Sequence, residues 1–90
     1  MNSETPQPES LEPSAFSSLV LSIAAAALAY MGHDVIPGAE KLEKSLPLAK
    51  QSIDTLTMLQ LKTEGNRTPA ETKMLDELLF QLRAEYVRAS

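Results

Sequence analysis

The sequence has no cysteine, no tryptophan and only three glycines among its 90 residues. The absence of cysteine excludes disulfide bonds, thiolate metal sites and thiol nucleophiles. Few glycines and an aromatic content of 4% leave little material for the turns and strands of an all-β barrel. A chain of this length without disulfides must gain its stability from packing or from a partner. The composition therefore favours one small helical domain.

Basic residues are also few, because 8 Lys and Arg stand against 12 Asp and Glu, which gives a net charge of −4. A surface of this charge repels polyanions, so nucleic-acid binding is not expected. Glu4, Glu9 and Glu12 lie in the first part of the chain, where no basic residue occurs. The remaining residues are therefore close to neutral.

Apolar side chains are almost absent from residues 1–13, where Met1 and Leu11 are the only ones. The same segment holds three prolines among Ser, Thr, Asn and Gln. It buries too little surface to offset the entropy lost on ordering. We therefore expect a disordered, acidic, proline-rich tail over 1–13 and a single helical domain over 14–90.

Residues 15–31 contain no charged side chain, and serines are the main interruption of an apolar run. Ser14 is a suitable N-cap and Gly32 is suitable just beyond the last turn, so this run predicts a first helix over 15–31. Apolar or small side chains point in every direction around it. Such a helix must be covered on nearly all sides.

A second helix is predicted over 46–64, because Ser45 can cap it and Pro47 falls in its first turn. Its apolar residues repeat every three or four positions, and Gly65 is expected to end it in the left-handed conformation. Between the first two helices, the proline and glycine within residues 33–45 predict a loop.

The third helix is predicted over 69–88, because Thr68, Pro69 and Glu71 form a capping box with proline at the first helical position. The connection to the second helix is short and the two helices have similar lengths, which favours an antiparallel hairpin. The apolar stripe of this helix contains Leu75, Leu78, Leu79, Leu82 and Tyr86. The predicted fold class is therefore all-α, with three helices.

No residue pattern indicates catalysis. The only histidine, His33, has no second histidine or cysteine with which to complete a zinc site. The helical acids fall mostly between the apolar positions, where a solvated face is expected; they are Asp54, Asp76, Glu77 and Glu85. Glycine-rich phosphate loops and nucleophile-elbow patterns are also absent from the sequence. We expect a protein that is not an enzyme and holds no cofactor and no metal.

The uncharged run over 14–33 is long enough to raise the question of a membrane span. Ala, Ser and Tyr make up more than half of its helical positions, so it is much weaker than a leucine-rich span. Lys41 is the first basic residue, which argues against a signal peptide. A membrane location is therefore not expected, and a cytoplasmic one is favoured.

Four blocks of the sequence resemble a known family; they are 15–22, 46–60, 62–71 and 78–87. They occur in the order found in the small bacterial family called domain of unknown function 1844, and the resemblance extends from Ser14 onward. It implies a short, predominantly helical, cytoplasmic bacterial protein. It implies no activity, substrate, cofactor or functional residue. The sequence differs at Leu61, where a charged residue is common in the family.

Two functions remain open. The favoured one is a small interaction protein that binds itself or another protein through the helix over 15–31. The alternative is a membrane-associated or accessory subunit that uses the same helix against lipid or within a larger complex. A hairpin covers only part of a third helix, so we expect a homo-oligomer, most simply a dimer. The candidate interface residues share this helix; they are Phe16, Leu19, Ser22, Ile23, Ala25, Ala26, Ala29 and Tyr30.

A monomer is the alternative to this oligomer. The loop over 33–45 would then fold over the uncovered face of the first helix and use Val35, Ile36 and Leu42 to do so.

Overall fold

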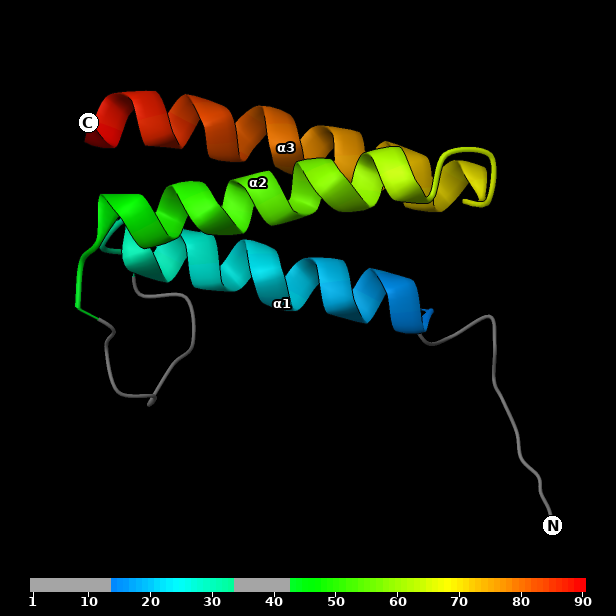
Figure 1. Cartoon of the computed structure of the whole chain (residues 1–90), viewed down its shortest axis with the longest axis horizontal. Helices are drawn as coiled ribbons and strands as arrows, with labels where there is room; N and C mark the ends of the chain where they lie inside the picture. Colours follow the sequence, from blue (N-terminus) through cyan, green and yellow to red (C-terminus); the bar gives the residue numbers. More distant parts are fainter. Residues whose placement is uncertain (1–13, 34–42) are drawn as a thin grey trace, which may run out of the picture.

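The computed structural model describes residues 14–33 and 43–90. They form three helices, α1 (Ala15–Tyr30), α2 (Leu46–Lys62) and α3 (Pro69–Ala89). Figure 1 shows the helices side by side, with the chain direction reversing from each helix to the next. Every pair of helices is in contact. The predicted all-α fold with three helices is confirmed, whereas the tail predicted over 1–13 and positions 34–42 of the predicted loop lie outside the described residues.

α1 begins and ends at the residues whose local chemistry predicts it. The Ser14 hydroxyl accepts a hydrogen bond from the backbone N–H of Ser17 at 3.1 Å. At the other end, Gly32 has a φ of +100°, in the region that favours glycine. The N–H of Gly32 donates to the carbonyl of Ala29, and the N–H of His33 donates to that of Leu28, each at 3.0 Å. These two bonds form a Schellman motif, which ends the helix one residue earlier than predicted.

α2 begins as predicted, because the Ser45 hydroxyl accepts a hydrogen bond from the Leu48 N–H at 3.3 Å. It ends at Lys62, two residues before the predicted end. The N–H of Asn66 donates to the Thr63 carbonyl at 2.8 Å and closes a turn. Gly65, with a φ of +82°, lies inside that turn. The left-handed glycine therefore serves the turn after the helix, which explains the difference in length.

The capping box predicted for α3 is present. The Thr68 hydroxyl accepts from the Glu71 N–H at 3.1 Å, and the Glu71 carboxylate accepts from the Thr68 N–H at 2.9 Å. The α2–α3 connection is further fixed by Arg67. One nitrogen, Nη1, donates to the Gln60 carbonyl at 2.6 Å and to the Thr63 hydroxyl at 2.8 Å, while Nε donates to the hydroxyl of Thr72 at 3.0 Å. A single guanidinium thus joins the last turn of α2 to the first turn of α3.

The core lies where the apolar stripes of the three helices meet, and no polar side chain among the described residues is buried in it. α2 and α3 contribute Ile53 and four leucines, whereas α1 contributes mainly small side chains. The buried cluster consists of Val20, Ala24, Ala27, Met31, Ala49, Ile53, Leu56, Leu75, Leu79 and Leu82. Because alanines face the hairpin, α1 reaches it with little side-chain volume between the backbones.

Candidate interaction surfaces

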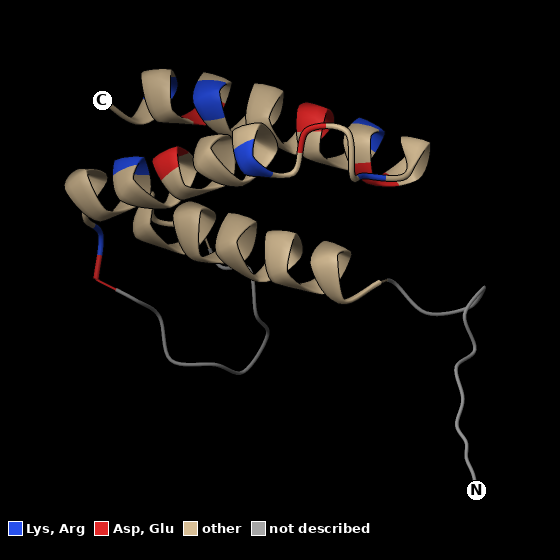
Figure 2. Cartoon of the chain, turned by 45° about the vertical axis from the view of Figure 1, so that its right-hand side comes forward, with Lys and Arg blue, Asp and Glu red and all other residues tan. Residues whose placement is uncertain are grey.

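α1 differs from the other two helices in its lack of charge. All Lys, Arg, Asp and Glu side chains of the three helices lie on α2 and α3, as Figure 2 shows. α2 and α3 have the usual charged outer faces, including the pairs Lys50–Asp54 and Lys73–Glu77. The outer face of α1 therefore contains only uncharged side chains. Within the described ranges, no helix is both long and apolar enough to cross a membrane.

The structure divides the eight predicted interface residues into two groups. Phe16, Ile23 and Tyr30 pack against the core cluster, so these three side chains help to hold α1 on the hairpin. Ala29 is only 9% exposed. The other four point outward or lie half-buried at the edge; they are Leu19, Ser22, Ala25 and Ala26.

These four exposed or half-buried residues define the α1 outer face, together with Ser18. Leu19 is 47% exposed, and Ser18 and Ser22 are exposed as well. The Ser22 hydroxyl donates to the carbonyl of Leu19 at 2.9 Å, so its polar group is already satisfied within the helix. The face thus combines one exposed leucine with small side chains.

A shallow groove borders this face between α1 and α2. Its walls combine side chains of both helices; they are Ser22, Ile23, Ala26, Tyr30, Leu48, Gln51, Ser52 and Thr55. Leu48 is among the exposed large apolar residues of the chain. The α1 outer face therefore continues onto the first turn of α2.

A second apolar surface lies on α3 and is not part of the predicted interface. Phe80 is 76% exposed and Val87 is 73% exposed, and Ala84 lies between them. The three residues are spaced by four and three positions, so they lie on one side of the helix. Sequence periodicity could have indicated them, because Phe80 and Val87 fall outside the core stripe of α3.

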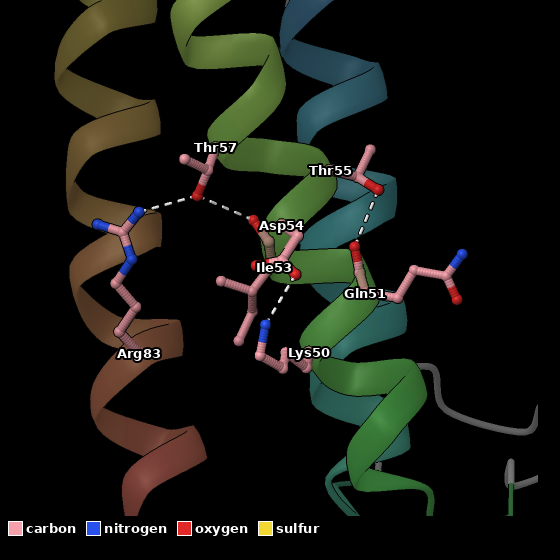
Figure 3. Close-up of polar contacts among 7 residues, drawn as sticks. All are labelled: Lys50, Gln51, Ile53, Asp54, Thr55, Thr57 and Arg83. Carbon is pink, nitrogen blue, oxygen red and sulfur yellow. Dashed lines mark hydrogen bonds and ion pairs between the residues drawn. The ribbon is translucent and has the colours of Figure 1, made fainter.

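Two opposite charges line this strip on the side that faces α2. The Asp76 carboxylate accepts a hydrogen bond from the Gln60 side chain at 2.8 Å. Arg83 donates to the Thr57 hydroxyl at 2.8 Å, and Thr57 in turn donates to the Ile53 carbonyl at 3.1 Å (Figure 3). Together they border a groove lined by Gln60, Asp76, Leu79, Phe80, Arg83, Ala84 and Val87. Among the described residues, neither Asp76 nor Arg83 takes part in an ion pair.

The remaining charged side chains behave as a solvated surface. The Lys50 ammonium lies 3.0 Å from the Asp54 carboxylate, and the hydrogen bond between them raises the pKa of Lys50. A hydrogen bond from Arg88 lowers the pKa of Glu85 below its ordinary value. Exposed pairs of this kind contribute little to stability. The solvated position predicted for Asp54, Asp76 and Glu77 is confirmed, while Glu85 is partly exposed.

His33 lies at the end of α1 and contacts α3. Its Nε2 atom is 3.4 Å from a carboxylate oxygen of Glu85. The described residues contain no group of three or more His, Cys, Asp or Glu side chains placed to hold a metal ion. His33 therefore connects the end of α1 to α3 at the surface.

The described residues define a small three-helix protein whose distinctive surfaces are two apolar helix faces, one on α1 and one on α3. A family model, Domain of unknown function (DUF1844), matches residues 13–88. The chain belongs to this family, which confirms the resemblance of its sequence. No curated protein and no solved structure matched the chain.

Proposed function

We propose that this protein is a non-catalytic, cytoplasmic interaction protein that self-associates through the α1 outer face. The observation that carries the proposal is the complete lack of charge on a surface helix that exposes Leu19. A helix on the surface of a monomer ordinarily has a charged outer side, as α2 and α3 do. A second copy of the same helix would cover this face.

The side chains of α1 suit a close helix pair. Ser18, Ser22 and Ala26 follow one another at intervals of four, so they lie along one line of the helix. Small residues on such a line let two backbones approach closely. In a symmetric dimer the same line of both copies would meet, and the exposed Leu19 would be covered by the partner.

The test is the molar mass of the full chain and of a Ser22→Glu variant, measured by light scattering coupled to size-exclusion chromatography. Ser22 is exposed, so a charge there leaves the core intact. We expect the variant to lose about half of the wild-type molar mass, because a buried charge without a partner opposes association. Asn66→Glu adds the same charge to an exposed position of the α2–α3 turn and serves as the matched control.

An unchanged mass for Ser22→Glu contradicts the proposal, as does a wild-type chain that stays at 9.8 kDa at micromolar concentration. The same variants distinguish the membrane-associated alternative. If α1 meets lipid, wild-type protein floats with phospholipid vesicles and Ser22→Glu does not. If α1 meets a second copy, both remain in the aqueous fraction.

A further inference from the structure

We propose that the apolar strip of α3 is a second self-association surface, in which the α3 helices of two copies pack antiparallel with their Phe80 side chains near the two-fold axis. We define the Phe80 face as Phe80, Ala84 and Val87 together with the bordering Asp76 and Arg83. This proposal concerns a different face from the α1 outer face and does not depend on it.

The large apolar side chains of the Phe80 face lie mostly in water. Phe80 and Val87 are the two most exposed large apolar side chains among the described residues, at 76% and 73%. They lie seven positions apart, and Ala84 between them leaves the strip open over two helical turns. A large aromatic side chain beside small residues on a helix is a typical anchor of a protein interface. The strip is therefore shaped to receive another helix.

The positions of the two charges identify the partner as a second copy. Asp76 precedes Phe80 by four residues, and Arg83 follows it by three. At about 1.5 Å per residue they lie about 6 Å before and about 4.5 Å beyond Phe80 along the helix. Their hydrogen bonds to Gln60 and Thr57 place both charges on the side of α3 that faces α2.

A two-fold axis that passes through Phe80 perpendicular to the helix places the second α3 antiparallel to the first. The α2-facing sides of both helices then lie along the same edge of the interface. Asp76 of one copy then meets Arg83 of the other at nearly the same height, and the symmetry repeats this pair. A parallel arrangement places identical residues at equal heights and offers no opposite charge. The Phe80 face is thus complementary to itself in the antiparallel arrangement only.

Both charged groups are available for this pairing. Gln60 and Thr57 hold them in place by single hydrogen bonds, and within the described part of the chain neither has an ionic partner. A carboxylate and a guanidinium can each accept or donate further hydrogen bonds. Closely placed α2 side chains thus orient the two groups before a second copy arrives.

The experiment exchanges these charges in the full chain, both in the wild type and in a Ser22→Glu background that disables the α1 outer face. The single variants Asp76→Arg and Arg83→Asp each place like charges at both pairs. We expect each to weaken self-association about tenfold or more in sedimentation velocity. An equimolar mixture of the two variants places opposite charges at both pairs again. We therefore expect the mixture, and the double variant, to recover the wild-type dissociation constant.

Glu64→Arg changes the net charge by the same amount as Asp76→Arg but lies in the α2–α3 loop, so it should leave association unchanged. Circular dichroism of each variant checks that its helices are kept. The proposal is overturned if the mixture fails to recover association, or if the single variants associate like the wild type. It is also overturned if Phe80→Ala abolishes binding to another protein while self-association stays the same.

Loss of association through Ser22→Glu but not through the α3 variants supports the α1 outer face alone, and the reverse supports the Phe80 face alone.

Discussion

Ser14 and Glu71 lie 57 positions apart, yet the Ser14 hydroxyl donates a hydrogen bond of 2.7 Å to the Glu71 carboxylate. The other oxygen of that carboxylate accepts from the backbone N–H of Thr68 at 2.9 Å. One side chain thus links the N-cap of α1 to the N-cap of α3. The bond from the Thr68 backbone, with smaller help from Ser14, lowers the pKa of Glu71. Both contacts at this corner of the bundle therefore favour the ionised form of the Glu71 carboxyl.

The first prediction concerns pH. Because the pKa of Glu71 is lower in the folded state than its ordinary value of 4.5, its contribution to stability is complete above pH 4.5 and is lost as the pH falls through the folded pKa. Glu71→Gln should therefore be less stable than the wild type at pH 7, and the difference should shrink towards pH 3. Urea unfolding at several pH values measures it, with Glu64→Gln as a matched removal of one carboxylate. A difference that stays constant over this range contradicts the prediction.

The second prediction concerns Arg67 at the α2–α3 connection. Arg67→Ala removes the donors to Gln60, Thr63 and Thr72, and we expect it to lower the free energy of unfolding by about 1.5 to 3 kcal/mol. Arg67→Lys should recover only part of this loss, because an ammonium cannot reproduce the planar fork of donors. Thermal unfolding of both variants checks this. Arg88→Ala removes an exposed guanidinium and is the control. If Arg67→Lys were as stable as the wild type, charge alone would matter at this position and the prediction would be wrong.

The third prediction concerns the Schellman motif that ends α1. Gly32 has a φ of +100°, and a Cβ added there would meet its nearest atom, Lys44 Cδ, at 3.9 Å. Space is therefore sufficient, and only the backbone conformation opposes a side chain. Gly32→Ala should cost about 1 to 2 kcal/mol, and Gly32→Asn should cost less because asparagine tolerates the left-handed region better. Chemical denaturation of the two variants measures the difference, and equal stability of Gly32→Ala and wild type contradicts it.

The starts of the helices could be predicted from the sequence because their chemistry is local. Ser14, Ser45 and Thr68 each cap a helix through a side chain that reaches only three residues along the chain. The ends differ by one or two residues because they depend on the geometry of the following turn, as at Gly65. Local pattern and tertiary structure therefore agree best at the N-termini.

The surfaces were less accessible to sequence reasoning. α1 is apolar or small on every side, so periodicity could not separate Phe16, Ile23 and Tyr30, which pack against the core, from Leu19 and Ser22, which point outward. Only the position of the hairpin makes that distinction. The Arg67 contacts likewise depend on how α2 and α3 meet across the turn, and no short motif encodes them.

The last prediction compares two neighbours in the sequence, Leu79 and Phe80. Leu79 is 1% exposed and belongs to the core cluster, whereas Phe80 is 76% exposed. Leu79→Ala should therefore lower the free energy of unfolding by about 2 to 5 kcal/mol through lost burial and the cavity that remains. Phe80→Ala should change the stability of the dissociated chain by no more than about 0.5 kcal/mol, because the side chain lies mostly in water.

Phe80→Ala should weaken self-association strongly although it changes stability little, because a second copy that covers the Phe80 face loses its largest contact. Unfolding must be measured at low protein concentration, because association stabilises the folded chain by mass action. Sedimentation velocity at higher concentration then reports the loss of self-association. A large loss of stability in Phe80→Ala at low concentration would show that this side chain serves the fold, and unchanged sedimentation would show that it serves no contact between copies.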